Sequence, residues 1–250
     1  MPGRGGKGGY IGSYRDPENP EALPNRITPA PPGPTRNEGA ADRERSAMRP
    51  NPAYDALDFL TKSAWPTAVF WLLLLGTCIV AALVLRQQPG QRTVRDVAIW
   101  LLRFIVGVLW WQQSLWKIPP NYAGLIYWMK QMVAHAAIPL QSQLVEHIVL
   151  PNIAVFGPLV YLTEVAIGIS LMLGLCTRLG ALAGVAMGLN LWLGLYSAPG
   201  EWPWTYFFLV VIQLLFVVDP PGRSLGADVL LQESVLRISP RGAALVRAIG

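Results

Sequence analysis

An acidic side chain lies in the middle of an apolar stretch that is long enough to cross a membrane. Residues 153–178 read IAVFGPLVYLTEVAIGISLMLGLCTR, with Glu164 near their centre. About twenty apolar residues span the hydrocarbon core at roughly 1.5 Å per residue, which puts Glu164 roughly 16 Å deep. A carboxyl group at that depth is costly unless it faces a partner group or a wet cavity. The fold therefore has to supply an interior contact for Glu164.

The overall composition also indicates a membrane protein. Of the 250 residues, 52% are hydrophobic and only 14% are charged, whereas soluble domains carry about 25% charged residues. The net charge of +5 comes from basic residues in the N-terminal arm, one loop and the tail, a topology signal that does not point to nucleic-acid binding. Cys78 and Cys176 have no metal-ligand spacing, so we expect two small buried side chains, no metal and no covalently bound cofactor.

We predict an all-α, polytopic membrane protein with a low-complexity arm at residues 1–63 and a polar tail at residues 221–250. The arm is rich in glycine and proline; it is either a free tail or a segment that orders across partner subunits. Residues 118–152 are expected to hold one or two short helices in the membrane interface, and the tail one short helix. Five membrane-spanning helices are predicted, at residues 64–85, 97–116, 153–178, 179–198 and 203–219.

The basic residues of the short loops predict the orientation, because they remain on the cytoplasmic side. The opposite side holds Lys117 and Lys130 in its short connections. We therefore place the C-terminus in the cytoplasm and the N-terminal arm outside. The arginines that fall on the predicted cytoplasmic side are Arg86, Arg92, Arg95, Arg178, Arg223, Arg237, Arg241 and Arg247.

One polar side chain on each of four predicted helices falls at a similar depth. Arg103 lies roughly 21 Å from the end marked by Lys117, close enough in depth to Glu164 to predict an ion pair. Asn190 and Gln213 complete a predicted interior layer. The layer is either an ion-pair and amide cluster that fixes the register of the helices, or a site for a quinone headgroup, a proton or another ligand; otherwise the helices face elsewhere.

Three glycines with four-residue spacing mark one face of the helix predicted at 179–198. Gly180, Gly184 and Gly188 would let another helix approach closely, within the bundle or from a partner. His135 and His147 are too few to indicate a haem or metal site. No nucleophile–base pair or phosphate loop is present, so no catalytic residue is assigned.

The order of several short motifs resembles the DoxX/DoxD family of small four-helix membrane proteins. The resemblance covers roughly residues 97–220 and leaves the arm, the helix at 64–85 and the tail outside. It marks Arg103, Lys117, Glu164, Gly174 and Arg178 as family positions. The motifs are Arg103 with Gly107, Trp116-Lys117, Glu164-x-x-x-Gly168 and Gly174-Leu-x-Thr-Arg178.

The family includes the DoxD subunit of thiosulfate:quinone oxidoreductase, so the resemblance implies a setting near quinone-linked complexes. We expect an accessory subunit of a respiratory or other electron-transfer complex in a bacterial or archaeal cytoplasmic membrane. Its partners would be membrane lipid and other subunits, bound through the arm, the helix at 64–85 and the glycine face of the helix at 179–198. A quinone or a structural lipid is the expected ligand. The alternatives are a quinone-reactive subunit of a thiosulfate:quinone oxidoreductase, and a small transporter or proton path that uses Glu164.

Overall fold

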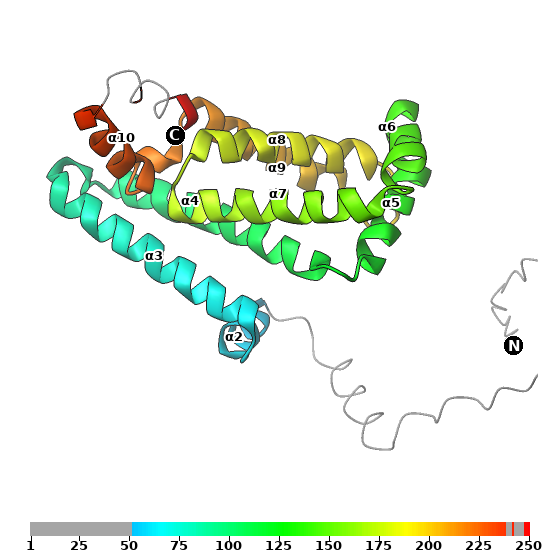
Figure 1. Ribbon diagram of the computed structural model, residues 1–250, viewed down its shortest axis with the longest axis horizontal. Helices are drawn as coiled ribbons and strands as arrows, with labels where there is room; N and C mark the ends of the chain where they lie inside the picture. The colour runs from blue at the N-terminus through cyan, green and yellow to red at the C-terminus, as the bar shows by residue number, and fades with distance from the viewer. Residues whose placement is uncertain (1–51, 239–241, 243–247) are drawn as a thin grey trace, which may run out of the picture. The chain divides into compact units, whose positions relative to one another are not determined.

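The computed structural model describes residues 52–238, 242 and 248–250 (Figure 1). Within these residues the chain forms helices and turns and no strand, which confirms the all-α prediction. The predicted arm, except for residues 52–63, lies outside the described residues. The chain divides into two units, residues 1–55 and residues 56–250, and the helical bundle belongs to the second.

Four helices form the bundle and lie side by side in Figure 1. Helix α4 packs on α7, α7 on α8, and α8 on α9. Their apolar core is filled by Trp110, Ile167, Leu171, Ala181 and Phe216, all buried. The bounds are α4 Val94–Ser114, α7 Ile153–Leu173, α8 Thr177–Gly194 and α9 Pro203–Val218.

Two of the predicted boundaries moved for identifiable reasons. Helix α4 begins three residues early, because the side chain of Thr93 accepts a hydrogen bond from the backbone N–H of Asp96 and caps the helix. Helix α7 ends at Leu173, because Gly174 adopts the left-handed conformation that terminates helices.

A second core closes the end of the bundle at which α4 finishes and α7 begins. The connection contains η2 Leu115–Lys117, α5 Ala123–His135, α6 Pro139–Leu144 and the π-helical turn η3 Val145–Val149. Buried Leu125, Met129 and Met132 on α5 pack with Leu195 beyond the end of α8. The structure thus contains the short helices predicted for residues 118–152.

Helix α3 (Trp65–Gln87) lies alongside the bundle, and α2 (Pro52–Thr61) precedes it. The tail folds back onto α3, because Leu225 and Val229 pack against Ala81 and Val84. The remaining elements are η1 Pro89–Gln91, η4 Pro221–Arg223 and α10 Ala227–Ile238, the last being the short helix predicted for the tail.

Two helices, α3 and α7, are long and apolar enough to cross a membrane by length and composition. Helix α9 is apolar but has 16 residues, roughly 24 Å at helical rise. The five-span topology stays a prediction for α4, α8 and α9.

The predicted glycine face of α8 is buried inside the bundle. A Cβ at Gly180 would lie 2.8 Å from the Ser170 Cβ on α7, and one at Gly184 would lie 2.6 Å from the Gln213 Cδ on α9. At Gly188 it would meet Val210 of α9 at 2.9 Å. The prediction that this face binds partner subunits was therefore wrong, because α7 and α9 already occupy it.

Helices α4 and α7 approach each other closely at Gly107 and Gly168. A Cβ at Gly107 would lie 2.8 Å from the Met172 backbone nitrogen and 3.0 Å from the Gly168 carbonyl oxygen. Backbone atoms cannot move aside as a flexible side chain can. The two helices therefore require the absence of a side chain at this position.

We predict that Gly107→Ala lowers the unfolding free energy by about 1–3 kcal/mol, because the added methyl overpacks the contact between α4 and α7. Gly90→Ala is the control, since nothing lies within 4 Å of its added Cβ. Unfolding in mixed detergent micelles measures both. Equal stability of the two variants would mean that the contact between α4 and α7 accommodates an added methyl group, contrary to this prediction.

Candidate functional site

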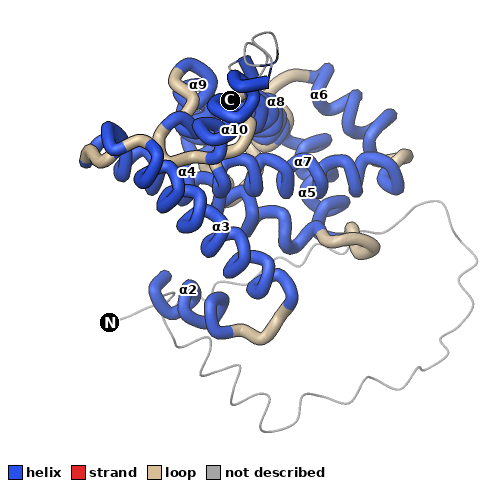
Figure 2. Tube along the Cα trace, turned by 60° about the vertical axis from the view of Figure 1, so that its left-hand side comes forward, coloured by secondary structure: helices blue, strands red, loops and turns tan. Residues whose placement is uncertain are grey.

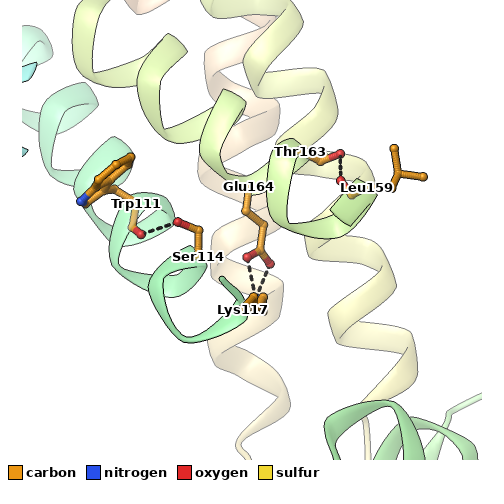
Figure 3. A network of polar contacts seen from close by, with 6 residues as sticks. All are labelled: Trp111, Ser114, Lys117, Leu159, Thr163 and Glu164. Carbon is orange, nitrogen blue, oxygen red and sulfur yellow. Dashed lines mark hydrogen bonds and ion pairs between the residues drawn. The ribbon is translucent and has the colours of Figure 1, made fainter. Parts of the chain in front are cut away.

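A buried ion pair joins the end of α4 to the middle of α7 (Figure 3). The Lys117 Nζ lies 2.5 Å from one carboxylate oxygen of Glu164 and 2.6 Å from the other. Lys117 is 3% exposed and Glu164 is fully buried. Glu164 thus has the interior partner that its position in an apolar stretch demanded.

The predicted Arg103–Glu164 pair was wrong, and the direction of the side chains explains why. Helical side chains lean toward the N-terminus of their own helix. Since α4 and α7 run in opposite directions, Glu164 leans toward the end that carries Lys117, and Arg103 leans toward the other end. The depth of a residue's backbone along its helix does not show in which direction its side chain leans.

One aromatic side chain contacts the lysine of the ion pair, and two more indoles are buried nearby along α4. The Lys117 Nζ lies 4.4 Å from the centre of the Trp116 ring, within the range of a cation–π interaction. One turn earlier, the buried Ser114 hydroxyl donates to the Trp111 carbonyl oxygen at 2.7 Å, as Figure 3 shows. The indole N–H groups of Trp110 and Trp111 are buried, and neither has an acceptor among the described residues.

Arg103 acts at the opposite end of α7. Its Nη1 donates to the carbonyl oxygens of Leu171 at 2.7 Å and Met172 at 3.3 Å. These carbonyls belong to the last turn of α7, where the helix has no further N–H groups to bond them and its dipole favours a positive charge. Arg103 therefore caps a neighbouring helix and has no salt bridge within the described residues.

The turn from Gly174 to Arg178 depends on this arginine. Gly174 has φ +72°, and a Cβ there would lie 2.7 Å from both the Arg103 Cζ and the Gly226 Cα. Arg178, expected to mark the membrane surface, donates from Nε to the Val217 carbonyl at 3.1 Å and so joins the turn to the end of α9. The Gly-Leu-x-Thr-Arg motif is thus a junction between helices.

Asp228 on α10 completes the junction, and sequence reasoning missed it. Its carboxylate accepts from the Cys176 N–H at 2.6 Å, from the Thr177 N–H at 3.1 Å and from the Thr177 hydroxyl at 2.7 Å. It therefore caps the start of α8 from a remote segment. The only signal was an acidic residue in the first turn of the predicted tail helix, and such residues are usually exposed.

The other two members of the predicted polar layer lie in separate places. The Asn190 side-chain oxygen accepts from the Gln141 amide of α6 at 2.6 Å, at the margin of the bundle. The Gln213 amide is fully buried beside Gly184, and neither its nitrogen nor its oxygen has a partner among the described residues. A single layer shared by four helices was therefore a wrong prediction.

The Cys176 thiol lies in the turn between α7 and α8. Burial raises its pKa above the ordinary value, and the negative charge of Asp228 raises it further. The thiol is therefore uncharged at neutral pH, which disfavours thiolate chemistry. In the described part of the chain no group of three or more His, Cys, Asp or Glu side chains is placed to hold a metal ion.

Comparison with known families agrees with the resemblance that the sequence motifs indicate. Residues 98–197 match the family model described as DoxX. This segment of the chain is therefore similar to the DoxX family. All five positions marked by the resemblance, from Arg103 to Arg178, fall within the match. No curated protein and no solved structure matches the chain.

The DoxX match and the apolar helices together make this a helical membrane protein. The match ends at residue 197, so it does not reach α9, which the resemblance had been expected to include. Gln213 and Asp228 lie beyond it. Both ion-pair residues lie within it, whereas the junction at the other end of α7 takes Asp228 from outside.

We predict that Lys117→Met and Glu164→Leu each lower the unfolding free energy by about 3–5 kcal/mol, because each leaves one charge buried without its partner. The double variant should lose less than either single variant, because no uncompensated charge remains. Unfolding in mixed micelles provides the double-mutant cycle.

The control for this cycle is Arg95→Met, which breaks a pair with Asp219 whose side chains are 75% and 73% exposed. Such a pair contributes about 0–1 kcal/mol. Additive losses at Lys117 and Glu164 would contradict a direct interaction between them.

We predict that Asp228→Ala lowers the unfolding free energy by about 2–4 kcal/mol, because it removes a cap and leaves buried donors of Cys176 and Thr177 without an acceptor. Asp219→Ala is the matched control, since that carboxylate is largely exposed. Stability equal to that of the control would mean that α10 does not hold the junction in solution.

Proposed function

We propose that this DoxX-domain protein is an integral-membrane structural subunit of a larger electron-transfer complex. The observation that carries the proposal is the use made of its buried charges. Both oxygens of Glu164 accept from Lys117, and Arg103 donates to the backbone of α7. These groups join helices to one another, which is the work of a scaffold. The electron-transfer setting rests on the resemblance to the DoxX/DoxD family.

Helix α3 is the surface that we assign to partner subunits. It precedes the DoxX match, which begins at residue 98. In its second half, Ile79 and Leu83 are 50% and 39% exposed. Helix α3 lies outside the matched segment and exposes apolar side chains. A partner subunit can therefore pack against α3 without changing the packing of the bundle.

The test is purification of the tagged full-length chain from its native membrane in mild detergent, followed by mass spectrometry and absorbance spectroscopy. Redox subunits bearing haem or pigment should accompany the chain in fixed stoichiometry. Recovery of the chain alone would contradict the proposal.

We predict that Ile79→Asn reduces the recovery of partner subunits, because a polar amide on α3 disfavours an apolar interface. Leu182→Asn on α8 is the control, since Leu182 is 49% exposed and lies within the DoxX domain. The comparison is made at equal amounts of folded chain. Equal losses in both variants would argue against α3 as the interface.

A second candidate function is a quinone-reactive subunit of the thiosulfate:quinone oxidoreductase type. The observation that favours it is the buried Gln213 amide, whose donor and acceptor atoms have no partner among the described residues. Unpaired buried polar groups are rare and call for an explanation. A quinone carbonyl could accept from this amide.

We predict that, if the second candidate is right, Gln213→Leu abolishes thiosulfate-dependent quinone reduction in membranes while the chain stays as stable as the wild type. Replacing an unpaired buried amide by an apolar group of similar size is close to neutral for folding. Full activity in the Gln213→Leu membranes, or no activity in wild-type membranes, would rule out this second candidate. The structural subunit would then be the remaining proposal.

A further inference from the structure

A hollow of about 390 Å³ lies at the elbow between α2 and α3. Figure 2 shows the loop that forms this elbow. Its lining includes Lys62, Ser63, Trp65, Ala68 and Trp71. The hollow therefore combines one ammonium group, the hydroxyls of Ser63 and Thr67, and two indole rings.

The elbow is held in shape by contacts of its own. The Trp71 indole N–H donates to the Leu60 carbonyl at 3.1 Å, and the Thr67 hydroxyl donates to the Phe59 carbonyl at 3.2 Å. The rings of Phe59 and Phe70 meet edge to face at 5.5 Å. These contacts fasten the end of α2 to the first two turns of α3, so the hollow is formed without a ligand.

The polar groups of the hollow are available for a ligand. Lys62 and Ser63 are exposed, and neither side chain has a hydrogen bond or ion pair within the described part of the chain. Trp65 and Trp71 are also exposed. Lysine and tryptophan at the end of a membrane-spanning helix occupy the headgroup region of a bilayer.

An apolar stripe leads from the hollow down α3. Ala68, Leu72 and Leu75 follow at intervals of four and three residues, which places them on one face of the helix, and Trp71 adjoins Leu72. Leu72 is 66% exposed and Leu75 is 57% exposed. The face that begins in the hollow thus continues toward the membrane interior as uncovered hydrocarbon.

We propose that the elbow binds one phospholipid molecule. The Lys62 ammonium and the Ser63 hydroxyl contact its phosphate, Trp65 and Trp71 flank its glycerol, and an acyl chain lies along Leu72 and Leu75. The volume suits a small polar headgroup, and charge-assisted bonds from lysine to phosphate are strong. Asp55 and Asp58 of α2 neither line the hollow nor form an ion pair with Lys62. Lys62 is therefore not neutralised by an ion pair with either carboxylate.

The experiment adds dioleoylphosphatidylglycerol to the delipidated full-length chain in detergent and counts the bound lipid per chain by native mass spectrometry. The wild type should retain one lipid at concentrations where Lys62→Gln and Trp65→Ala retain about tenfold less, because each loses a direct contact. Lys130→Gln is the matched control, since Lys130 is an exposed lysine beside aromatic residues on α5. Its lipid retention should equal that of the wild type.

Two further arms identify the ligand. Dioleoylglycerol, which has no phosphate, should not be retained, and millimolar glycerol phosphate should not displace the lipid, because it lacks the acyl chain. Equal retention by Lys62→Gln and Lys130→Gln would overturn the proposal, as would equal retention of dioleoylglycerol. Displacement by glycerol phosphate would also overturn it, by assigning the hollow to a free phosphate. The test does not depend on the proposed function, because lipid is counted on the isolated chain.

Discussion

The bundle depends on matching charge inside a helical membrane protein. Glu164 can lie in the middle of α7 only because α4 is followed by a turn that brings Lys117 back against it. Taking either charge out of water alone would cost several kcal/mol, so the pair constrains where α4 ends and how α7 is rotated. The glycine contact between α4 and α7 then allows the two helices to lie close enough for the pair to form.

The two ends of α7 are held by different chemistry. At one end, the ion pair joins two side chains, and its lysine contacts the Trp116 ring. At the other, Arg103 bonds main-chain carbonyls, and Asp228 bonds main-chain amides of the adjoining turn. The second arrangement provides hydrogen-bond partners for the unpaired carbonyls at the end of α7 and the unpaired amides at the start of α8. It depends little on which side chains the two helices carry. The Gly-Leu-x-Thr-Arg motif, which helped to carry the family resemblance, is largely this joint.

Much of the fold could be predicted from the sequence, because long apolar runs fix the number and approximate bounds of the helices. The need of Glu164 for an interior partner also followed from its surroundings alone. The partner was misidentified because depth was counted along the axis, whereas the lean of each side chain decides which end it reaches. Asp228 could not be found from pattern, because its burial comes from a fold-back of the tail that no local periodicity encodes. Gln213 was placed correctly inside the bundle, yet its lack of a partner is visible only once the neighbouring helices are packed.

The position of Asp228 in the chain has a consequence for biosynthesis. The turn between α7 and α8 lacks its cap until α10 has left the ribosome, fifty-one residues after Thr177. Asp228 is therefore synthesised after all four helices of the bundle, and the joint between α7 and α8 is the last of their contacts to become available. A chain truncated before Asp228 would contain all four helices but not the carboxylate that caps α8.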